Sequence, residues 1–181
     1  MQEKFIIMEQ SLVDKFSFCP GCGSSNFMKE THKSHRCLDC GFEMFINSAA
    51  SVVAIVLHEG KILLTRRAFE PKKGELDLPG GFVDAGESLE QALFREMKEE
   101  TMLEIETFKW LFSFPNKYLY SGIEVPTTDN FFLCTVPDIQ RLQPQDDVAE
   151  LIWIPLKELK PQDMAFVSMQ NAIKELQQRL L

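Results

Sequence analysis

The strongest constraint on the fold is a glycine-rich loop that leads directly into a helix signal. Residues 78–81 read Leu-Pro-Gly-Gly, and Gly86 follows shortly after them. Glycines allow backbone angles or close approaches that a side chain would block. Ser88 and Gln91 then match a capping box, in which two side chains satisfy backbone donors of the first helical turn. The sequence therefore predicts a loop followed by a helix that begins near Leu89.

The predicted helix carries two carboxylates on its apolar face. At about 100° per residue, Glu96 and Glu100 fall in the same narrow stripe as Leu89 and Leu93. A buried carboxylate without a partner is costly, and a hard divalent cation compensates it through oxygen ligands. The alternative is a solvated helix face whose acidic run only resembles a metal site.

The spacing of this segment resembles the Nudix box, the signature of hydrolases that cleave nucleoside diphosphates linked to another group. The matching positions are Gly81, Glu87, Arg95, Glu96, Glu99 and Glu100. Met102 departs from the pattern, which has glycine at that position. The resemblance implies an α/β fold, the Nudix α/β/α sandwich with a mixed sheet. Arg95 and Glu99 are expected to form an ion pair, and Glu87 either binds metal through water or holds Arg95.

The resemblance also implies a catalytic Mg²⁺ or Mn²⁺ ion. Its expected ligands are Glu96, Glu99 and Glu100, with a backbone carbonyl near Gly80. The ion would neutralise the diphosphate and orient the attacking water, while a carboxylate accepts the water's proton. The reaction predicted is hydrolysis of a phosphoanhydride.

Two positions are candidates for the catalytic base. Glu99 lies within the box. Many Nudix proteins place a further carboxylate a few residues before a Trp-containing strand, and Glu150 has that place, with Asp146 and Asp147 as rivals. The choice stays open at this point.

Further substrate contacts are expected around the box. Arg66 and Arg67 precede it and are candidates for phosphate binding, because arginine offers a bidentate fork. The alternative is a pair of surface charges near a loop. A nucleoside base could stack on Tyr118, Tyr120 or Phe82.

Two C-x₂-C pairs with 14 residues between them predict a structural zinc site. The four ligands are Cys19, Cys22, Cys37 and Cys40. Four thiolates close a tetrahedral site and leave no position for water. Disulfides are the alternative, which a cytosolic setting disfavours. His32 and His35 could replace a cysteine, but we expect them to be exposed in the spacer.

The cysteine module resembles a zinc ribbon, and a ribbon before a Nudix box occurs in the NADH pyrophosphatase group. We therefore expect an N-terminal segment and ribbon over residues 1–46 and a Nudix domain over residues 47–181. That group carries a Ser-Gln-Pro-Trp motif after the box, and here the region reads Ser113-Phe114-Pro115-Asn116. The substrate expected is a dinucleotide or nucleotide sugar, such as NADH or ADP-ribose, with NADH as one candidate.

Apolar, β-branched and aromatic runs predict the strands of this domain. The expected strands are residues 51–57, 62–65, 108–114, 131–136 and 151–156. The first two form a hairpin through a turn at residues 58–61, and residues 115–118 are expected to form another turn. A final helix is expected after Pro161.

Charge and hydropathy limit the partners. The net charge is −8 with a pI near 5.0, which argues against broad binding to nucleic acid or anionic membranes. No apolar run approaches the roughly 20 residues of a membrane helix, and residues 1–10 lack the apolar core of a secretory signal. We expect a cytoplasmic protein, with a homodimer left open.

Two other functions compete with hydrolysis. A regulator could keep the fold to sense a nucleotide while the ribbon contacts DNA or protein, but such a regulator often loses box glutamates and this chain keeps all four. Removal of a 5′ cap from RNA is disfavoured by the acidic charge. The fold does not select the leaving group.

Overall fold

The computed structural model describes residues 15–181. Residues 1–10, whose composition argued against a secretory signal, lie outside this range. The first described element is a small antiparallel sheet of three strands: β1 (Phe27–Lys29), β2 (Ser34–Cys37) and β3 (Glu43–Phe45). Its core contains Cys19, Phe27 and Cys37, with Met44 packed against them. The predicted domain boundary at residue 46 falls between β3 and the next strand, and it stays a prediction.

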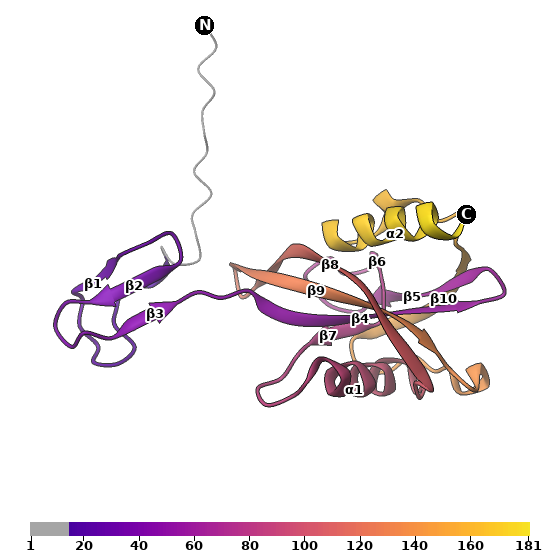
Figure 1. The fold of residues 1–181 in the computed structure, drawn as a ribbon, viewed down its shortest axis with the longest axis horizontal. Helices are drawn as coiled ribbons and strands as arrows, with labels where there is room; N and C mark the ends of the chain where they lie inside the picture. The colour runs from indigo at the N-terminus through magenta and orange to yellow at the C-terminus, as the bar shows by residue number, and fades with distance from the viewer. Residues whose placement is uncertain (1–14) are drawn as a thin grey trace, which may run out of the picture.

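A second sheet of seven strands forms the rest of the framework (Figure 1). Its strands are β4 (Ala49–His58), β5 (Lys61–Arg67), β6 (Leu76–Asp77), β7 (Gly80–Phe82), β8 (Thr107–Tyr120), β9 (Ile123–Thr135) and β10 (Val148–Pro155). The main order is β10-β5-β4-β9-β8, with β6 beside β5 and β7 beside β4. The β4–β9 pair is parallel and the other pairs are antiparallel. The predicted mixed sheet is therefore confirmed.

Two helices cover the opposite faces of this sheet, α1 (Leu89–Thr101) and α2 (Val167–Leu180) (Figure 1). The alternation along β4 explains the two cores. Val53 and Ile55 pack in the cluster that includes α2, whereas Val52 and Ala54 pack in the cluster that includes α1. A strand covered on both faces is apolar at successive positions, and this arrangement confirms the α/β/α sandwich.

The turn expected at residues 115–118 is wrong. Strand β8 continues to Tyr120, and Pro115 pairs with Thr128 of β9. Because β8 lies at the edge of the sheet, one row of its backbone donors needs no partner strand, so proline is tolerated there. Pro115-Asn116 is typical of a turn, but on this edge strand the two residues continue the strand instead.

The capping box of α1 is present as expected. The Ser88 hydroxyl accepts from the Gln91 backbone N–H at 3.3 Å, and the Gln91 side chain accepts from the Ser88 N–H at 2.8 Å. At the other end, Met102 adopts a left-handed conformation with φ of 60° and donates to the Lys98 carbonyl. Glycine favours this conformation at helix ends, which explains the glycine of the family pattern at this position.

Met102→Gly is expected to stabilise the protein. A side chain in the left-handed region costs about 1 kcal/mol, and relief of that cost should raise the midpoint of thermal unfolding by about 2–4 °C. Lys98→Gly, at an exposed helical position, is the matched control and should destabilise by about 1 kcal/mol. The measurement is thermal unfolding. Midpoints that fall equally in Met102→Gly and Lys98→Gly would contradict this account of Met102.

Candidate active site

Two glycines bring β7 against β4 and α1. Gly80 has φ of 149°, and a Cβ there would lie 2.1 Å from the Val52 carbonyl oxygen. A Cβ on Gly81 would lie 2.3 Å from a carboxylate oxygen of Glu96. The Gly80 N–H donates to Glu100 at 2.9 Å. The loop backbone therefore holds one helix carboxylate directly and leaves room for the other.

Arg95 joins this loop to the helix. Its guanidinium forms two 2.8 Å hydrogen bonds with the Glu87 carboxylate and one of 3.0 Å with the Phe82 carbonyl. It also pairs with Glu96 at 2.7 Å and with Glu99 at 3.1 Å. The expected pair with Glu99 is thus present. Hydrogen bonding from Arg95 lowers the pKa of Glu87 to about 2.

The two carboxylates on the apolar face of α1 are desolvated. Glu100 is 5% exposed, and burial, followed by the nearby Asp147 carboxylate, raises its pKa well above the usual range. Burial also raises the pKa of Glu96, against the opposing effect of Arg95. Buried like charges favour a compensating cation. These oxygen donors therefore fit a hard divalent ion.

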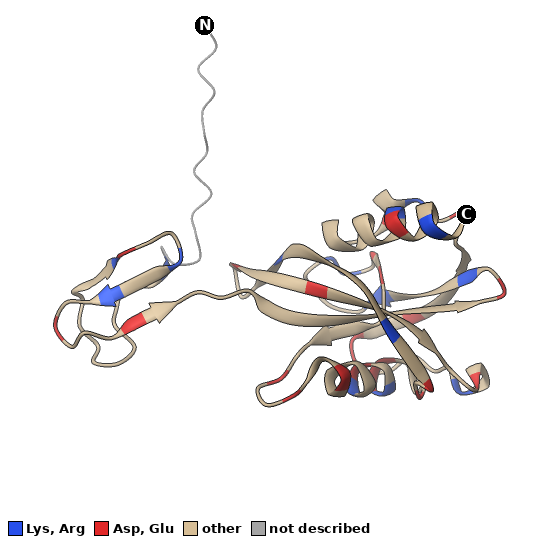
Figure 2. Ribbon diagram, viewed as in Figure 1, with Lys and Arg blue, Asp and Glu red and all other residues tan. Residues whose placement is uncertain are grey.

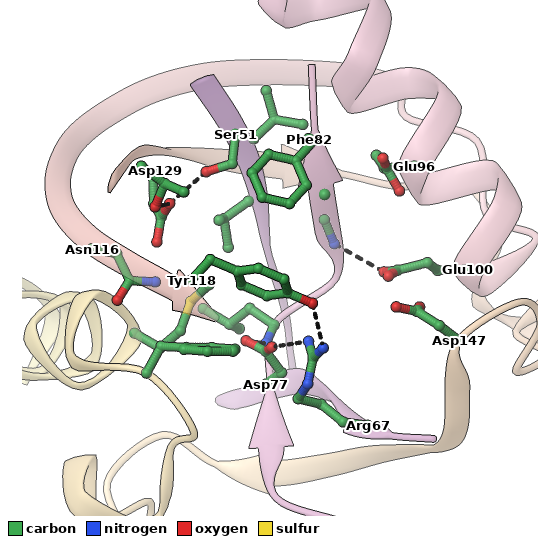
Figure 3. A pocket seen from close by; sticks show the side chains of 18 of the residues that line it. Ser51, Arg67, Asp77, Phe82, Glu96, Glu100, Asn116, Tyr118, Asp129 and Asp147 are labelled. Carbon is green, nitrogen blue, oxygen red and sulfur yellow. Dashed lines mark hydrogen bonds and ion pairs between the residues drawn. The ribbon is translucent and has the colours of Figure 1, made fainter. Parts of the chain in front are cut away.

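A cavity of about 260 Å³ opens beside these carboxylates. Glu96, Glu100 and Asp147 lie on one side of it (Figure 3). Of the other candidate site positions named from the sequence, Gly80, Arg67, Phe82 and Tyr118 also line it. Figure 2 shows acidic residues in α1 and in the loop before it.

Five candidate site residues named from the sequence do not line the cavity: Arg66, Glu87, Glu99, Tyr120 and Glu150. The side chain of Glu99 is 50% exposed and held by Arg95. Glu150 lies opposite Arg66 in the pairing of β10 with β5, and their side chains form an ion pair of 3.0 Å. Of the three candidates outside the box, Asp146 and Asp147 line the cavity and Glu150 does not, and the identity of the base stays a prediction.

Arg67 supports the cavity wall. Its guanidinium donates to Asp77 at 3.0 Å, to the Tyr118 hydroxyl at 2.9 Å and to the Pro71 carbonyl at 2.7 Å. The Phe166 ring lies 5.2 Å from it. Burial, partly offset by Arg67, raises the pKa of Asp77 to about 6. Most of the donors of Arg67 are already used, so its predicted role in phosphate binding stays a prediction.

A buried polar cluster in the same cavity was missed from the sequence. Asp129 of β9 is 4% exposed and accepts hydrogen bonds from Ser51, Thr127 and Ser168. Thr127 is a neighbour in β9, but Ser51 and Ser168 come from β4 and α2, so no local spacing could reveal them. Asp129 lies in the polar part of β9, between Thr128 and Asn130, so its position in the strand gave no distinctive signal.

The four cysteines of the ribbon converge. Their Sγ atoms all lie within 4.8 Å of one another and could hold a metal ion. The Cys19–Cys40 and Cys22–Cys37 sulfur distances are 3.7 and 3.6 Å, far longer than a disulfide bond of about 2.05 Å. Four sulfur donors in this arrangement fit tetrahedral zinc.

The expectation that His32 and His35 are both exposed is wrong for His35. His32 is exposed, but His35 lies in β2 with 5% exposure, and its ring is 5.0 Å from that of Phe27. Within residues 15–181, its Nδ1 atom is buried without a hydrogen-bond partner. The spacer forms a strand here rather than an open loop, which is why His35 is covered.

Purified protein is expected to contain about one zinc ion per chain. Cys37→Ser should lose that metal and unfold the ribbon, because Cys37 is fully buried beside the other thiols. Cys134→Ala is the control, since Cys134 lies in the core next to α1. Elemental analysis that finds equal zinc in Cys37→Ser and wild type would contradict the site.

Comparison with known proteins identifies the fold family. The NUDIX domain model matches residues 47–176. The chain belongs to the NUDIX family. No helix among the described residues is long and apolar enough to cross a membrane.

Curated NUDIX relatives match part of the chain. An ADP-ribose pyrophosphatase of Methanocaldococcus jannaschii is 38% identical over 78 residues, which cover 42% of this chain and 46% of the relative. The NAD-capped RNA hydrolase NudC of Vibrio atlanticus is 30% identical over 104 residues, which cover 58% of this chain and 38% of the relative. The matches therefore span less than half the length of either relative.

Solved structures agree on the fold. A NUDIX hydrolase from Nitrosomonas europaea has a TM-score of 0.69 at 24% identity, covering 91% of this chain and 92% of that one. The NUDIX domain of Shewanella oneidensis NrtR, complexed with ADP ribose, has a TM-score of 0.61 at 27% identity, covering 76% and 91%. The first likeness supports the fold alone.

Proposed function

We propose that this NUDIX protein hydrolyses a nucleoside diphosphate linked to another group, with the help of a divalent metal ion. The observation that carries the proposal is the set of carboxylates from Glu96, Glu100 and Asp147 at one side of a single cavity. Two of them come from α1 and the third precedes β10. Such a set of carboxylates suits a divalent cation, which would in turn neutralise and position a phosphoanhydride.

Glu96 and Glu100 would hold Mg²⁺ or Mn²⁺. When bound, such an ion neutralises the diphosphate and lowers the pKa of a coordinated water. The Gly80 N–H fixes one oxygen of Glu100, and Arg95 fixes one oxygen of Glu96. Glu99, which pairs with Arg95 through one oxygen, stays a predicted ligand.

Asp147 is the proposed acceptor of the water's proton. It lines the cavity and its charge acts on Glu100, whereas Glu99 and Glu150 are engaged by arginines outside the cavity wall. A general base must lie within hydrogen-bond reach of the water that it activates. Asp146 and Asp147 both line the cavity, and we assign the role to Asp147 because its charge acts on Glu100.

The proposed substrate is an ADP-containing diphosphate, such as ADP-ribose or NADH. The relatives support this class, since one is named an ADP-ribose pyrophosphatase and a solved NUDIX domain holds ADP ribose. A non-catalytic sensor of the same ligand is less well supported, because all four box glutamates are kept. A structural zinc ion, a cytoplasmic location and a homodimer remain predictions from the sequence.

Asp147→Asn is expected to lower the turnover number for ADP-ribose by about 100-fold. Glu150→Gln is the matched comparison and should stay within about 2-fold of wild type, because a partly exposed ion pair contributes little. The assay is phosphatase-coupled phosphate release with Mg²⁺ over ADP-ribose, NADH, nucleoside triphosphates and NAD-capped RNA. Loss of activity in Glu150→Gln alone would reverse this assignment, and no cleavage by wild type would refute the function.

A further inference from the structure

The cavity has two chemically different ends. The metal-site carboxylates occupy one end, and Asp129, Ser51 and Asn116 occupy the other, with the rings of Phe82 and Tyr118 between them (Figure 3). If phosphates bind at the first end, the second end must receive another part of the substrate. The groups at that end identify its chemistry.

The second end offers no free cation for a phosphate. Among the described residues that line the cavity there are seven carboxylates and one guanidinium, that of Arg67. Arg67 is bound to Asp77 and to the Tyr118 hydroxyl. A terminal phosphate or carboxylate would therefore meet uncompensated negative charge, which excludes an anionic group.

Asp129 retains one acceptor position. Its Oδ1 accepts from the hydroxyls of Ser51 at 2.5 Å and Thr127 at 2.7 Å, and its Oδ2 accepts from Ser168 at 2.6 Å. A carboxylate has about four lone-pair positions, so Oδ2 can accept one more hydrogen bond. The three hydroxyls also fix the orientation of this carboxylate, which is a property of a recognition group.

Asn116 lies beside this acceptor. It pairs with Thr127 in the β8–β9 register and lines the cavity. Its side-chain amide makes no hydrogen bond within the described part of the chain. An acceptor on Asp129 next to a donor on Asn116 complements an amino group next to a ring nitrogen, the pattern on adenine and cytosine.

Phe82 supplies a surface for a flat ring. It is 37% exposed and meets Tyr118 edge to face, with 5.3 Å between ring centroids. Tyr118 is itself covered by Arg67 and by Phe166, 5.7 and 5.5 Å away. Phe82 is therefore the ring with a free face, and bases of any type stack on such a face.

We propose that Asp129 and Asn116 bind the exocyclic amine and adjacent nitrogen of an adenine or cytosine base that stacks on Phe82. The proposal rests on the proposed function and names the part of the substrate that selects it. Base selectivity is thereby assigned to Asp129, a carboxylate outside the Nudix box. One of the hydroxyls that orient it, that of Ser51, lies 78 positions away in the sequence. Uracil and hypoxanthine carry a carbonyl in place of the amine and would present an acceptor to an acceptor.

The first test uses the wild-type full chain and ligands that cannot be cleaved. Calorimetric titration with AMP, purine riboside 5′-monophosphate and IMP compares an amine, a hydrogen and a carbonyl at the same position. Purine riboside 5′-monophosphate and IMP lack the hydrogen bond to the charged acceptor, so their dissociation constants should be higher than that of AMP by about 10-fold or more. CMP against UMP repeats the comparison. Equal affinities within either series, or no binding of AMP and CMP, would overturn the proposal.

The second test changes the acceptor. Asp129→Asn keeps the shape but places an N–H where Oδ2 was, so the preference should shift from AMP towards IMP and from CMP towards UMP by at least about 10-fold. Ser113→Ala, at an exposed position of β8, is the control and should keep the wild-type preference. An unchanged preference in Asp129→Asn overturns the proposal. If that variant does not fold, the wild-type ligand series decides.

The outcomes separate this proposal from the enzymatic function. Cleavage of diphosphates with no preference among bases leaves the function intact and overturns the base site. Amine-dependent binding of AMP without any cleavage supports the base site and refutes the function.

Discussion

Glu100→Gln is expected to abolish most hydrolysis while the fold stays intact. Loss of a group that only orients a metal ligand costs about 10-fold to 100-fold, so loss of a ligand charge should lower the turnover number by at least about 100-fold. The glutamine oxygen can still accept from the Gly80 N–H, as Glu100 does at 2.9 Å. The variant therefore removes charge with little change in shape.

The same change should not destabilise metal-free protein. Burial and Asp147 raise the pKa of Glu100 in the folded state. A carboxyl whose folded-state pKa is raised contributes stability at low pH that is lost as pH rises through that pKa. Glutamine carries no such penalty, so in EDTA near pH 8 the unfolding midpoint of Glu100→Gln should equal or exceed that of wild type, with the difference vanishing near pH 4.

Glu99→Gln is the comparison for Glu100→Gln. Glu99 is half exposed and bound to Arg95, so its loss should cost less activity than the loss of Glu100. Unimpaired turnover in Glu100→Gln, or a marked fall in its metal-free stability at pH 8, would remove the basis for the metal site.

Gly80→Ala is expected to damage the whole protein. Its Cβ would lie 2.1 Å from the Val52 carbonyl oxygen, and φ of 149° is unfavourable for alanine. Because both partners are backbone in paired strands, neither can move easily. We expect destabilisation of about 3 kcal/mol, which corresponds to a midpoint roughly 6–12 °C lower.

Gly81→Ala is the matched neighbour with the opposite outcome. Its Cβ would meet the end of the Glu96 side chain, which can rotate away. The unfolding midpoint should fall by only about 2 °C, while displacement of Glu96 should lower the turnover number by about 10-fold to 100-fold. Equal stability losses in the two variants, measured by thermal unfolding, would contradict the separate roles given to these glycines.

Local signals predicted the helix and its loop well. The capping box, the stripe that places Glu96 and Glu100 together, and the Arg95–Glu99 pair all depend on residues within a few positions of one another. The hairpin of β4 and β5 has the same property. Helical and strand periodicities fix such neighbours without knowledge of the tertiary structure.

Long-range features were not accessible. Asp147 and Glu150 are only three positions apart in the sequence. A bulge between Val148 and Glu150 in β10 shifts the register of the strand, and Glu150 meets Arg66 whereas Asp147 lines the cavity. Ser168 reaches Asp129 only because α2 packs over the sheet. The sequence pattern therefore located the carboxylates of α1 and named Phe82 and Tyr118, but it left Ser51, Asn116 and Asp129 unpredicted.

The most direct test of the central claim is chromatography of the products from ADP-ribose incubated with wild-type protein and Mg²⁺. Attack of water within the diphosphate bridge predicts AMP and ribose phosphate in equal amounts, with neither formed in EDTA nor by Glu100→Gln. Intact ADP-ribose after incubation with wild-type protein would contradict the account. Cleavage only of a nucleoside triphosphate, with release of pyrophosphate, would also contradict it.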